Sequence, residues 1–346
     1  MKQTVWIFHR SRGFSLVEFM VAILLGAIVI AGAVSVYLGS KRSYTEVEQF
    51  SELSENGRFA IQLMTYSLRH GGFFGAAKGG DISRGPDLGS VSGDCGAGSG
   101  ADASVFNTTD NLIAFRSTDG NAFSCIGDAA TNSDVLVIKS ARPSPRYDAD
   151  PADPNQPKDG VISFVRGGGN VFEADQAYLI ANSEAGVLID GDDVTKPDVS
   201  VGGPMALAVA WPYVFEAFYV QNLAEPTLTR LVLERNGANW SLRKEQLVPG
   251  VEAMNFRFGM DTTGNGNVDT YTNAAGVGGD WDRVVVAEIF LLMRTLREDP
   301  RHTDEKTYQV ADRSLSGAAL GARFHRVLLS GSVNLRNPGL TLRAGG

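Results

Sequence analysis

The chain has 346 residues, a formal net charge of −8 and 40 glycines. This length can bury a sizeable core in one large or two smaller domains. The acidic balance, with no basic stripe to offset it, argues against nucleic acid as a general partner. The glycine content favours a turn-rich fold over a helical bundle.

The N-terminus combines a short basic leader with a long apolar segment. The leader holds Lys2, Arg10 and Arg12 and no acid, and no charge occurs from Phe19 to Ser40. About 20 apolar residues can span the hydrocarbon core as a helix. The basic leader keeps the N-terminus in the cytoplasm and sends everything after about Lys41 to the other side. The segment is too long for the core of a secretory signal peptide, and no small-x-small cleavage site closes it.

Glu18 lies at the edge of this apolar segment. A charge inside the bilayer costs about 2.5–3.5 kcal/mol on insertion scales, so an acid there marks a functional site. Pairing with an ammonium group on a neighbouring subunit would lower that cost, and docking would coincide with charge neutralisation. A plain signal anchor is the alternative, and it gives Glu18 no role.

The sequence Gly13-Phe14-Ser15-Leu16-Val17-Glu18 resembles the class III leader of type IV pilins and pseudopilins. The resemblance implies that a membrane peptidase cuts after Gly13 and methylates Phe14 as the new N-terminal residue. It also implies that Glu18 pairs with the terminal amine of a neighbouring subunit.

The apolar segment after the leader continues into one long predicted helix, Phe14 to Arg69. Apolar or small residues recur every three or four positions beyond Lys41, which predicts one helix face: Tyr44, Val47, Phe50, Leu53, Gly57, Ile61, Met64 and Leu68. No proline interrupts the chain from Phe14 to Arg69, and Gly71-Gly72 is a strong stop. We divide the chain into leader 1–13, membrane or filament-core helix half 14–40, amphipathic helix half 41–72 and head 73–346.

The head is predicted to be rich in strands. Residues 75–104 and 142–159 have the composition of exposed loops. The predicted strands are Asn111–Arg116, Asp134–Lys139, Val161–Arg166, Ala177–Ala181, Val187–Asp190, Trp211–Val220, Thr229–Glu234, Trp240–Lys244, Val251–Phe258, Arg283–Arg294 and Arg323–Leu335. Strands do not alternate with helices, which argues against a doubly wound parallel sheet. The predicted fold is α+β, with the long N-terminal helix packed on an antiparallel sheet.

Two cysteines, Cys95 and Cys125, both lie in the part that the pilin resemblance places in the periplasm. A disulfide between them would close a loop of about 30 residues and stabilise the fold by roughly 3–4 kcal/mol. Two free thiols are the alternative in this oxidising compartment.

One loop of the head has the spacing of metal ligands. Oxygen-bearing side chains alternate from Asp261 to Asp269, with Gly266 at the sixth position, as in the first half of a calcium loop. Thr263 replaces an acid or Asn, and Thr272 stands where a bidentate Glu is expected. The calcium ligands would be Asp261, Asn265, Asn267 and Asp269, completed by Asp280 or Asp282. A tight turn between two strands is the alternative, because Asn-Gly favours a hairpin turn.

The sequence contains no catalytic motif. The four histidines are scattered, and no zinc-protease, phosphate-loop or nucleophile-elbow pattern occurs. We therefore expect no enzyme, no small-molecule substrate and no cofactor other than the calcium considered above. A membrane-anchored periplasmic enzyme or sensor is the alternative from a different class.

Further segments resemble the PilW family of minor pilins. They are Asn56–Ala60, Leu68–Gly75, Val251–Asp261, Trp281–Val284, Leu291–Arg294, Arg323–Val327 and Val333–Asn337. The resemblance implies a single-pass inner-membrane protein with a periplasmic head, processed by the prepilin peptidase. It would join other minor pilins in a complex that primes assembly of the major pilin and carries a large adhesin at the pilus tip. A J-type pseudopilin of a type II secretion system is the nearest alternative.

Overall fold

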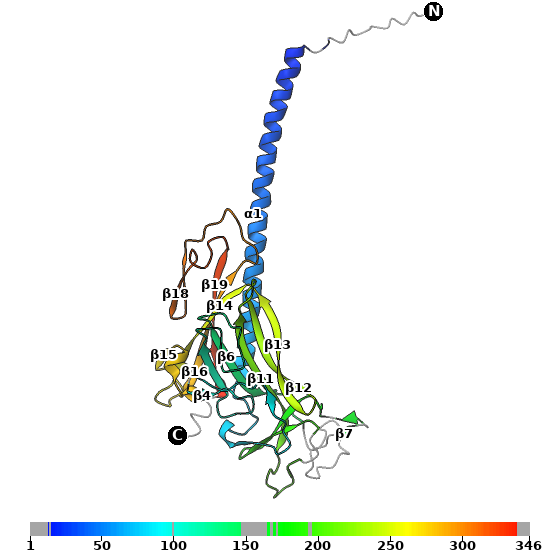
Figure 1. The fold of residues 1–346 in the computed structure, drawn as a ribbon, viewed down its shortest axis with the longest axis vertical. Helices are drawn as coiled ribbons and strands as arrows, with labels where there is room; N and C mark the ends of the chain where they lie inside the picture. The colour runs from blue at the N-terminus through cyan, green and yellow to red at the C-terminus, as the bar shows by residue number, and fades with distance from the viewer. Residues whose placement is uncertain are drawn as a thin grey trace, which may run out of the picture. The chain divides into compact units, whose positions relative to one another are not determined.

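The computed structural model describes residues 13, 15–98, 100–146, 165–166, 169–170, 172–192 and 196–337. The chain forms two compact units, Met1–Ser51 and Glu52–Gly346. Helix α1, Leu16–His70, contributes to both units, and the strands belong to the second (Figure 1). Leader residues 1–12 and Phe14 lie outside the described residues.

Helix α1 matches its predicted extent closely. It ends where Gly71 N donates to Ser67 O, and Gly72 follows with a φ of 71°. This left-handed conformation is open to glycine and terminates the helix. The buried face begins at Leu53 and continues through Ala60, Met64 and Leu68. The earlier part of the predicted stripe differs, because Tyr44, Val47 and Phe50 are exposed.

Close approach of α1 to the head depends on two glycines. A Cβ at Gly57 would lie 2.2 Å from Leu329 Cδ1, and a Cβ at Gly331 would lie 2.7 Å from Ile61 Cγ2. Both separations are far below van der Waals contact, so a larger side chain at either position requires the facing side chain, Leu329 or Ile61, to move. Leu329 and Gly331 belong to β19, Arg326–Asn334.

Two sheets form the core of the head. The larger has nine strands in the order β1-β10-β9-β11-β12-β13-β2, with β6 paired to β11 and to β5. Its strands are β1 Ile82–Arg84, β2 Val91–Ser92, β5 Leu112–Arg116, β6 Asp134–Ala141, β9 Ala177–Ala181, β10 Gly186–Asp190, β11 Val209–Gln221, β12 Thr227–Asn236 and β13 Asn239–Pro249. Its pairs are antiparallel except for β1 with β10 and β13 with β2.

The smaller sheet has the order β15-β14-β16-β19 and is antiparallel. Its other strands are β14 Val251–Met260, β15 Thr270–Thr272 and β16 Val284–Arg294. The remaining elements are η1 Gly79–Asp81, the pair β3 Ala97–Gly98 with β4 Ala101–Asp102, the pair β7 Val165–Arg166 with β8 Gly169–Asn170, α2 Ala274–Val277, η2 Trp281–Arg283, and the hairpin β17 Thr307–Val310 with β18 Arg313–Ser316. The α+β prediction is confirmed.

Two side chains join the sheets at the outer edge of β14. Ser133 Oγ donates to Met254 O and accepts from Met254 N, each at 2.9 Å. Asp134 Oδ2 accepts from Phe256 N at 2.8 Å. These buried groups satisfy backbone atoms that a neighbouring strand would otherwise pair. One hydrophobic core therefore continues from the larger sheet into the smaller one.

The segment 75–104 differs from the predicted surface loop. It contributes short strands to the larger sheet and buries Leu88, Cys95 and Ala103 in the main core. Its composition of Gly, Ser and Asp indicates turns. Composition does not reveal that a disulfide and hydrogen bonds fix the segment to the rest of the head. Of the predicted strand Val161–Arg166, only residues 165–166 are described, and they form part of β7. Residues 147–159 of the second predicted loop lie outside the described residues.

Candidate assembly site and the polar clusters of the head

Glu18 lies in the first turn of α1, at the beginning of its apolar half. The free amides at a helix N-terminus carry partial positive charge and favour an acid there. The apolar side chains that follow are exposed, including Leu16, Phe19 and Ile30. This part of α1 is long and apolar enough to cross a membrane. Among the described residues, no cation lies within ion-pair distance of Glu18.

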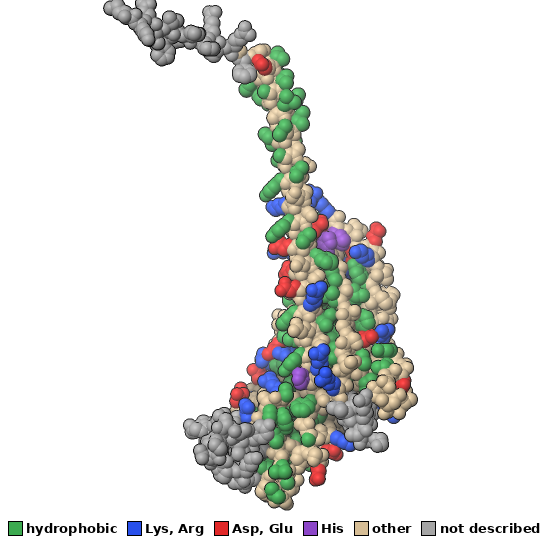
Figure 2. Space-filling view, turned by 180° about the vertical axis from the view of Figure 1, so that it is seen from behind, with side chains coloured by type: hydrophobic (Ala, Val, Ile, Leu, Met, Phe, Trp, Pro, Cys, Tyr) green, Lys and Arg blue, Asp and Glu red, His purple; other side chains and the backbone are tan. Residues whose placement is uncertain are grey.

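Green apolar side chains surround the upper part of the helix in Figure 2, with red carboxylate atoms at its beginning. A carboxylate next to an apolar run of this length is costly to place in lipid unless a cation pairs with it. Gly13 is exposed and precedes the helix, and Phe14 lies outside the described residues. The arrangement offers charge pairing and apolar packing.

The disulfide and a buried lysine hold segment 75–104 on the larger sheet. Cys95 and Cys125 are joined, with their Cα atoms 4.7 Å apart. Beneath them, Lys139 of β6 is fully buried and donates from Nζ to Asn107 O at 2.7 Å and to Asp102 O at 3.1 Å. Burial lowers the pKa of Lys139 to about 7, against the opposing effect of nearby carboxylates. The only sequence signal was a lysine inside an otherwise apolar strand.

The carboxylates of the Asp261 loop bind the loop's own backbone. Asp261 accepts from the amides of Gly264 at 2.7 Å and Gly266 at 2.5 Å, and Asp269 Oδ2 accepts from the amides of Thr262 at 2.9 Å and Thr263 at 3.0 Å. Burial acts to raise the pKa of Asp261, and the amides lower it by more, so the net pKa is below its usual value.

The other two predicted calcium ligands do not join those carboxylates. The side-chain oxygen of Asn265 accepts from the amide of Asn267 at 2.8 Å. Within the described residues, no group of three or more His, Cys, Asp or Glu side chains is placed to hold a metal. Backbone amides pointing at both carboxylates are the hydrogen-bond pattern of Asx turns. The loop has the hydrogen bonds of a tight turn, and calcium binding there stays a prediction.

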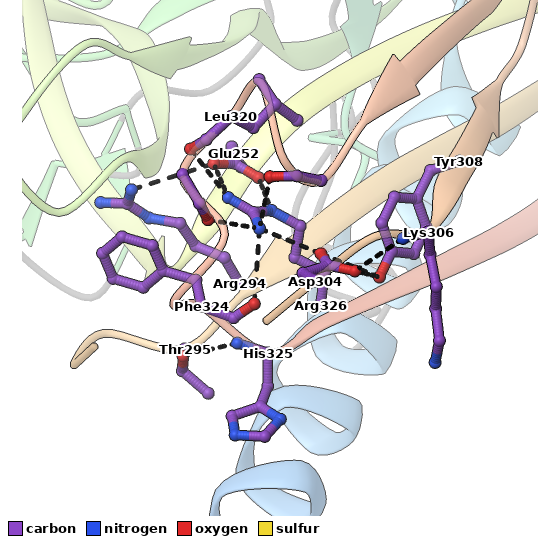
Figure 3. Close-up of polar contacts among 12 residues, drawn as sticks. Glu252, Arg294, Thr295, Asp304, Lys306, Tyr308, Leu320, Phe324, His325 and Arg326 are labelled. Carbon is purple, nitrogen blue, oxygen red and sulfur yellow. Dashed lines mark hydrogen bonds and ion pairs between the residues drawn. The ribbon is translucent and has the colours of Figure 1, made fainter. Parts of the chain in front are cut away.

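A cluster of buried charged side chains lies at the connection between β16 and β19 (Figure 3). The side chain of Arg326 has no exposed surface and lies between two carboxylates. Its Nε is 2.6 Å from Glu252 Oε2, and its Nη1 is 3.0 Å from Asp304 Oδ2. The guanidinium also donates to the carbonyls of Leu320 and Gly321, each at 2.9 Å. Because the five N–H donors of the guanidinium all find acceptors in this chain, Arg326 fixes the segment that carries β17 and β18.

Sequence reasoning did not anticipate this cluster. Arg326 lies in the segment Arg323–Val327 that resembles the PilW family, and its partners Glu252 and Asp304 lie 74 and 22 residues away in the chain. An arginine at the start of a strand is usually exposed, so sequence alone favours a solvated side chain. The strand register and the fold of the intervening connection are needed to bring the three together.

Comparison with known families assigns both ends of the chain. A prokaryotic N-terminal methylation motif matches residues 8–34, which include Gly13, Phe14 and Glu18. A model of type IV pilus-assembly protein W matches residues 217–337, from β11 to the end of β19. The two matches are those of a PilW-family prepilin-like protein. Comparisons with characterised proteins and with solved structures gave no significant match.

The two matches support a pilin-like protein related to type IV pili, and its N-terminal helix is long and apolar enough to span a membrane. The match to assembly protein W contains the smaller sheet, the Asp261 loop and the Arg326 cluster. The disulfide and Lys139 lie outside both matched segments.

Proposed function

We propose that this chain is a minor pilin that primes assembly of a type IV pilus. The observation that carries the proposal is Glu18 in the first turn of an apolar helix, directly after a methylation motif. After cleavage behind Gly13, the amine of Phe14 becomes the terminal cation. Pairing of Glu18 with the terminal amine of a neighbouring subunit neutralises both charges in lipid and sets the register of adjacent helices.

The subunit is inserted in the inner membrane, with the head in the periplasm. Its partners are the prepilin peptidase, other minor pilins and the major pilin. A head that extends over residues 73–346 fits best at the end of a filament, where one side has no neighbour to accommodate. At that end it would carry a large adhesin. The proposed role is structural and involves no catalysis.

Replacing Glu18 with Ala tests the register argument. The variant should insert in the membrane and lose its Met1–Gly13 leader, and the cells should lose surface pili and twitching motility. Glu46→Ala is the matched control, because Glu46 is an exposed acid on the same helix beyond the apolar segment. Wild-type piliation of the Glu18→Ala strain would refute the argument.

Two further measurements test processing and pathway. Mass spectrometry of the mature protein should find N-methyl-Phe14 at the N-terminus, and an intact Met1 would refute cleavage. A strain lacking this chain should lose pili and keep type II secretion. Loss of secretion with normal pili would establish the J-type pseudopilin instead.

A further inference from the structure

Among the strands that the structure describes, none pairs with the outer edge of β19. The strand terminates the smaller sheet, and its register with β16 is unbroken. Just beyond its two ends, His325 O accepts from Thr295 N at 3.0 Å and Leu335 N donates to Val285 O at 2.8 Å. Because bonded and non-bonded pairs alternate in an antiparallel ladder, the odd-numbered residues of β19 bond to β16. The even-numbered residues direct their amides and carbonyls away from the sheet.

These outward backbone groups are accessible. Ser330, Ser332 and Asn334 are exposed, and Leu328 is half-buried. Within the part of the chain that the structure describes, no hydrogen bond reaches the outward amides of Leu328, Ser330 or Ser332. Helix α1 covers the face of the strand at Leu329 and Gly331 and leaves this edge open.

Other long strand edges in the head are protected, and the β19 edge is not. Ser133 and Asp134 cap the outer edge of β14. Strand β13 carries three consecutive charges, Arg243 to Glu245, which discourage pairing with another chain. From Val327 to Val333, β19 contains neither a charge nor a proline. An exposed, uncharged edge of this kind is a template for strand addition.

The direction of β19 argues against a second copy as the added strand. Gly57 lies beside Leu329, Ile61 lies beside Gly331, and Asn337 Nδ2 donates to Gly71 O at 3.0 Å. The strand therefore runs along α1 in the same direction. Two copies that dock with residues 53–68 of α1 running parallel therefore bring their β19 strands together in parallel. An antiparallel pair is the more stable arrangement, and a segment of different sequence that runs in the opposite direction forms one.

We propose that β19 accepts an extended, uncharged segment of a partner subunit as a fifth, antiparallel strand of the smaller sheet. The backbone of Leu328, Ser330 and Ser332 supplies the hydrogen bonds, and alternate apolar side chains of the incoming strand pack beside α1. The inference rests on the proposed function, because it requires a partner in the pilus complex.

Hydrogen exchange of the full-length protein tests the proposal. The chain is measured alone in detergent micelles and in the complex purified through a tag on this chain from piliated cells. The outward amides of residues 328–332 should exchange about tenfold more slowly, or slower still, in the complex. Unchanged exchange there would overturn the proposal. Protection already present in the isolated chain would also overturn it, since residues of this chain or a second copy would then cover the edge.

A matched pair of variants separates the backbone from the side chain. Ser330→Pro removes an outward amide that the sheet does not use, and an edge strand tolerates proline at such a position. Ser330→Ala removes the hydroxyl and keeps the amide. We expect Ser330→Pro to lower the yield of complex at least tenfold and Ser330→Ala to leave it unchanged. Equal yields would contradict strand addition. If the wild-type chain forms no complex, the proposed function fails and this inference fails with it, whereas a complex with an unprotected β19 refutes this inference alone.

Discussion

Replacing Arg326 with Met should destabilise the head by about 3–5 kcal/mol, because it leaves two buried carboxylates without a counter-ion. Glu252 and Asp304 keep only 10% and 2% of their side-chain surface exposed, so water cannot replace the lost cation. Arg294 Nη1, 3.8 Å from Glu252 Oε1, compensates in part and favours the lower end of this range. The carbonyls of Leu320 and Gly321 lose their donors as well.

Guanidinium unfolding of the full-length protein in micelles, followed by tryptophan fluorescence, measures the loss, since Trp240 and Trp281 are buried. Arg257→Met is the control: its pair with Glu288 is 2.6 Å long and its side chain is 47% exposed, so about 0–1 kcal/mol should be lost. Adding Asp304→Asn to Arg326→Met should restore part of the lost unfolding free energy, because it removes one unpaired buried charge. Equal losses for Arg326→Met and Arg257→Met would refute the reasoning.

The lowered pKa of Lys139 means that, between pH 7 and 10.5, the unfolded chain holds a proton that the folded chain has released. The unfolding free energy should therefore rise with pH over this window by up to about 1.4 kcal/mol per pH unit. Denaturation of Lys139→Met measured across the same pH range should not show this rise. Replacing Cys95 and Cys125 with Ala should cost about 3–4 kcal/mol in the same unfolding assay; an unchanged midpoint would contradict this. Millimolar calcium should leave the melting temperature unchanged, and a rise abolished by Asp261→Ala would establish a metal site.

Much of the fold could be predicted because the patterns involved are local. The absence of proline and the Gly71-Gly72 stop predicted α1, and apolar alternation predicted long strands such as β14 and β16 within a few residues. Glu18 could be recognised because a charge beside a long apolar run is conspicuous without any tertiary information.

The features that could not be predicted depend on contacts between distant residues. Segment 75–104 has the composition of a loop, yet Lys139 and a disulfide hold it in the core. The edge capping of β14 by Ser133 needs the relative position of two sheets, which no local pattern encodes. Sequence alone could not separate a tight turn from a metal site at the Asp261 loop, because the oxygens that bind cations also accept amide hydrogens in tight turns.

The place where α1 joins the sheets has a mechanical consequence. The helix lies on the head from Leu53 to Leu68 before the chain turns at Gly71, and Gly72 N then donates to Lys139 O at 3.0 Å. Traction applied toward the N-terminus of α1 would have to slide this buried face past the strands it packs against, including β19 beside Gly57 and Ile61, before it loaded the chain at Gly71. Because Leu329 fills the notch at Gly57, sliding is blocked sterically, and the load is shared along the interface and not concentrated at one bond.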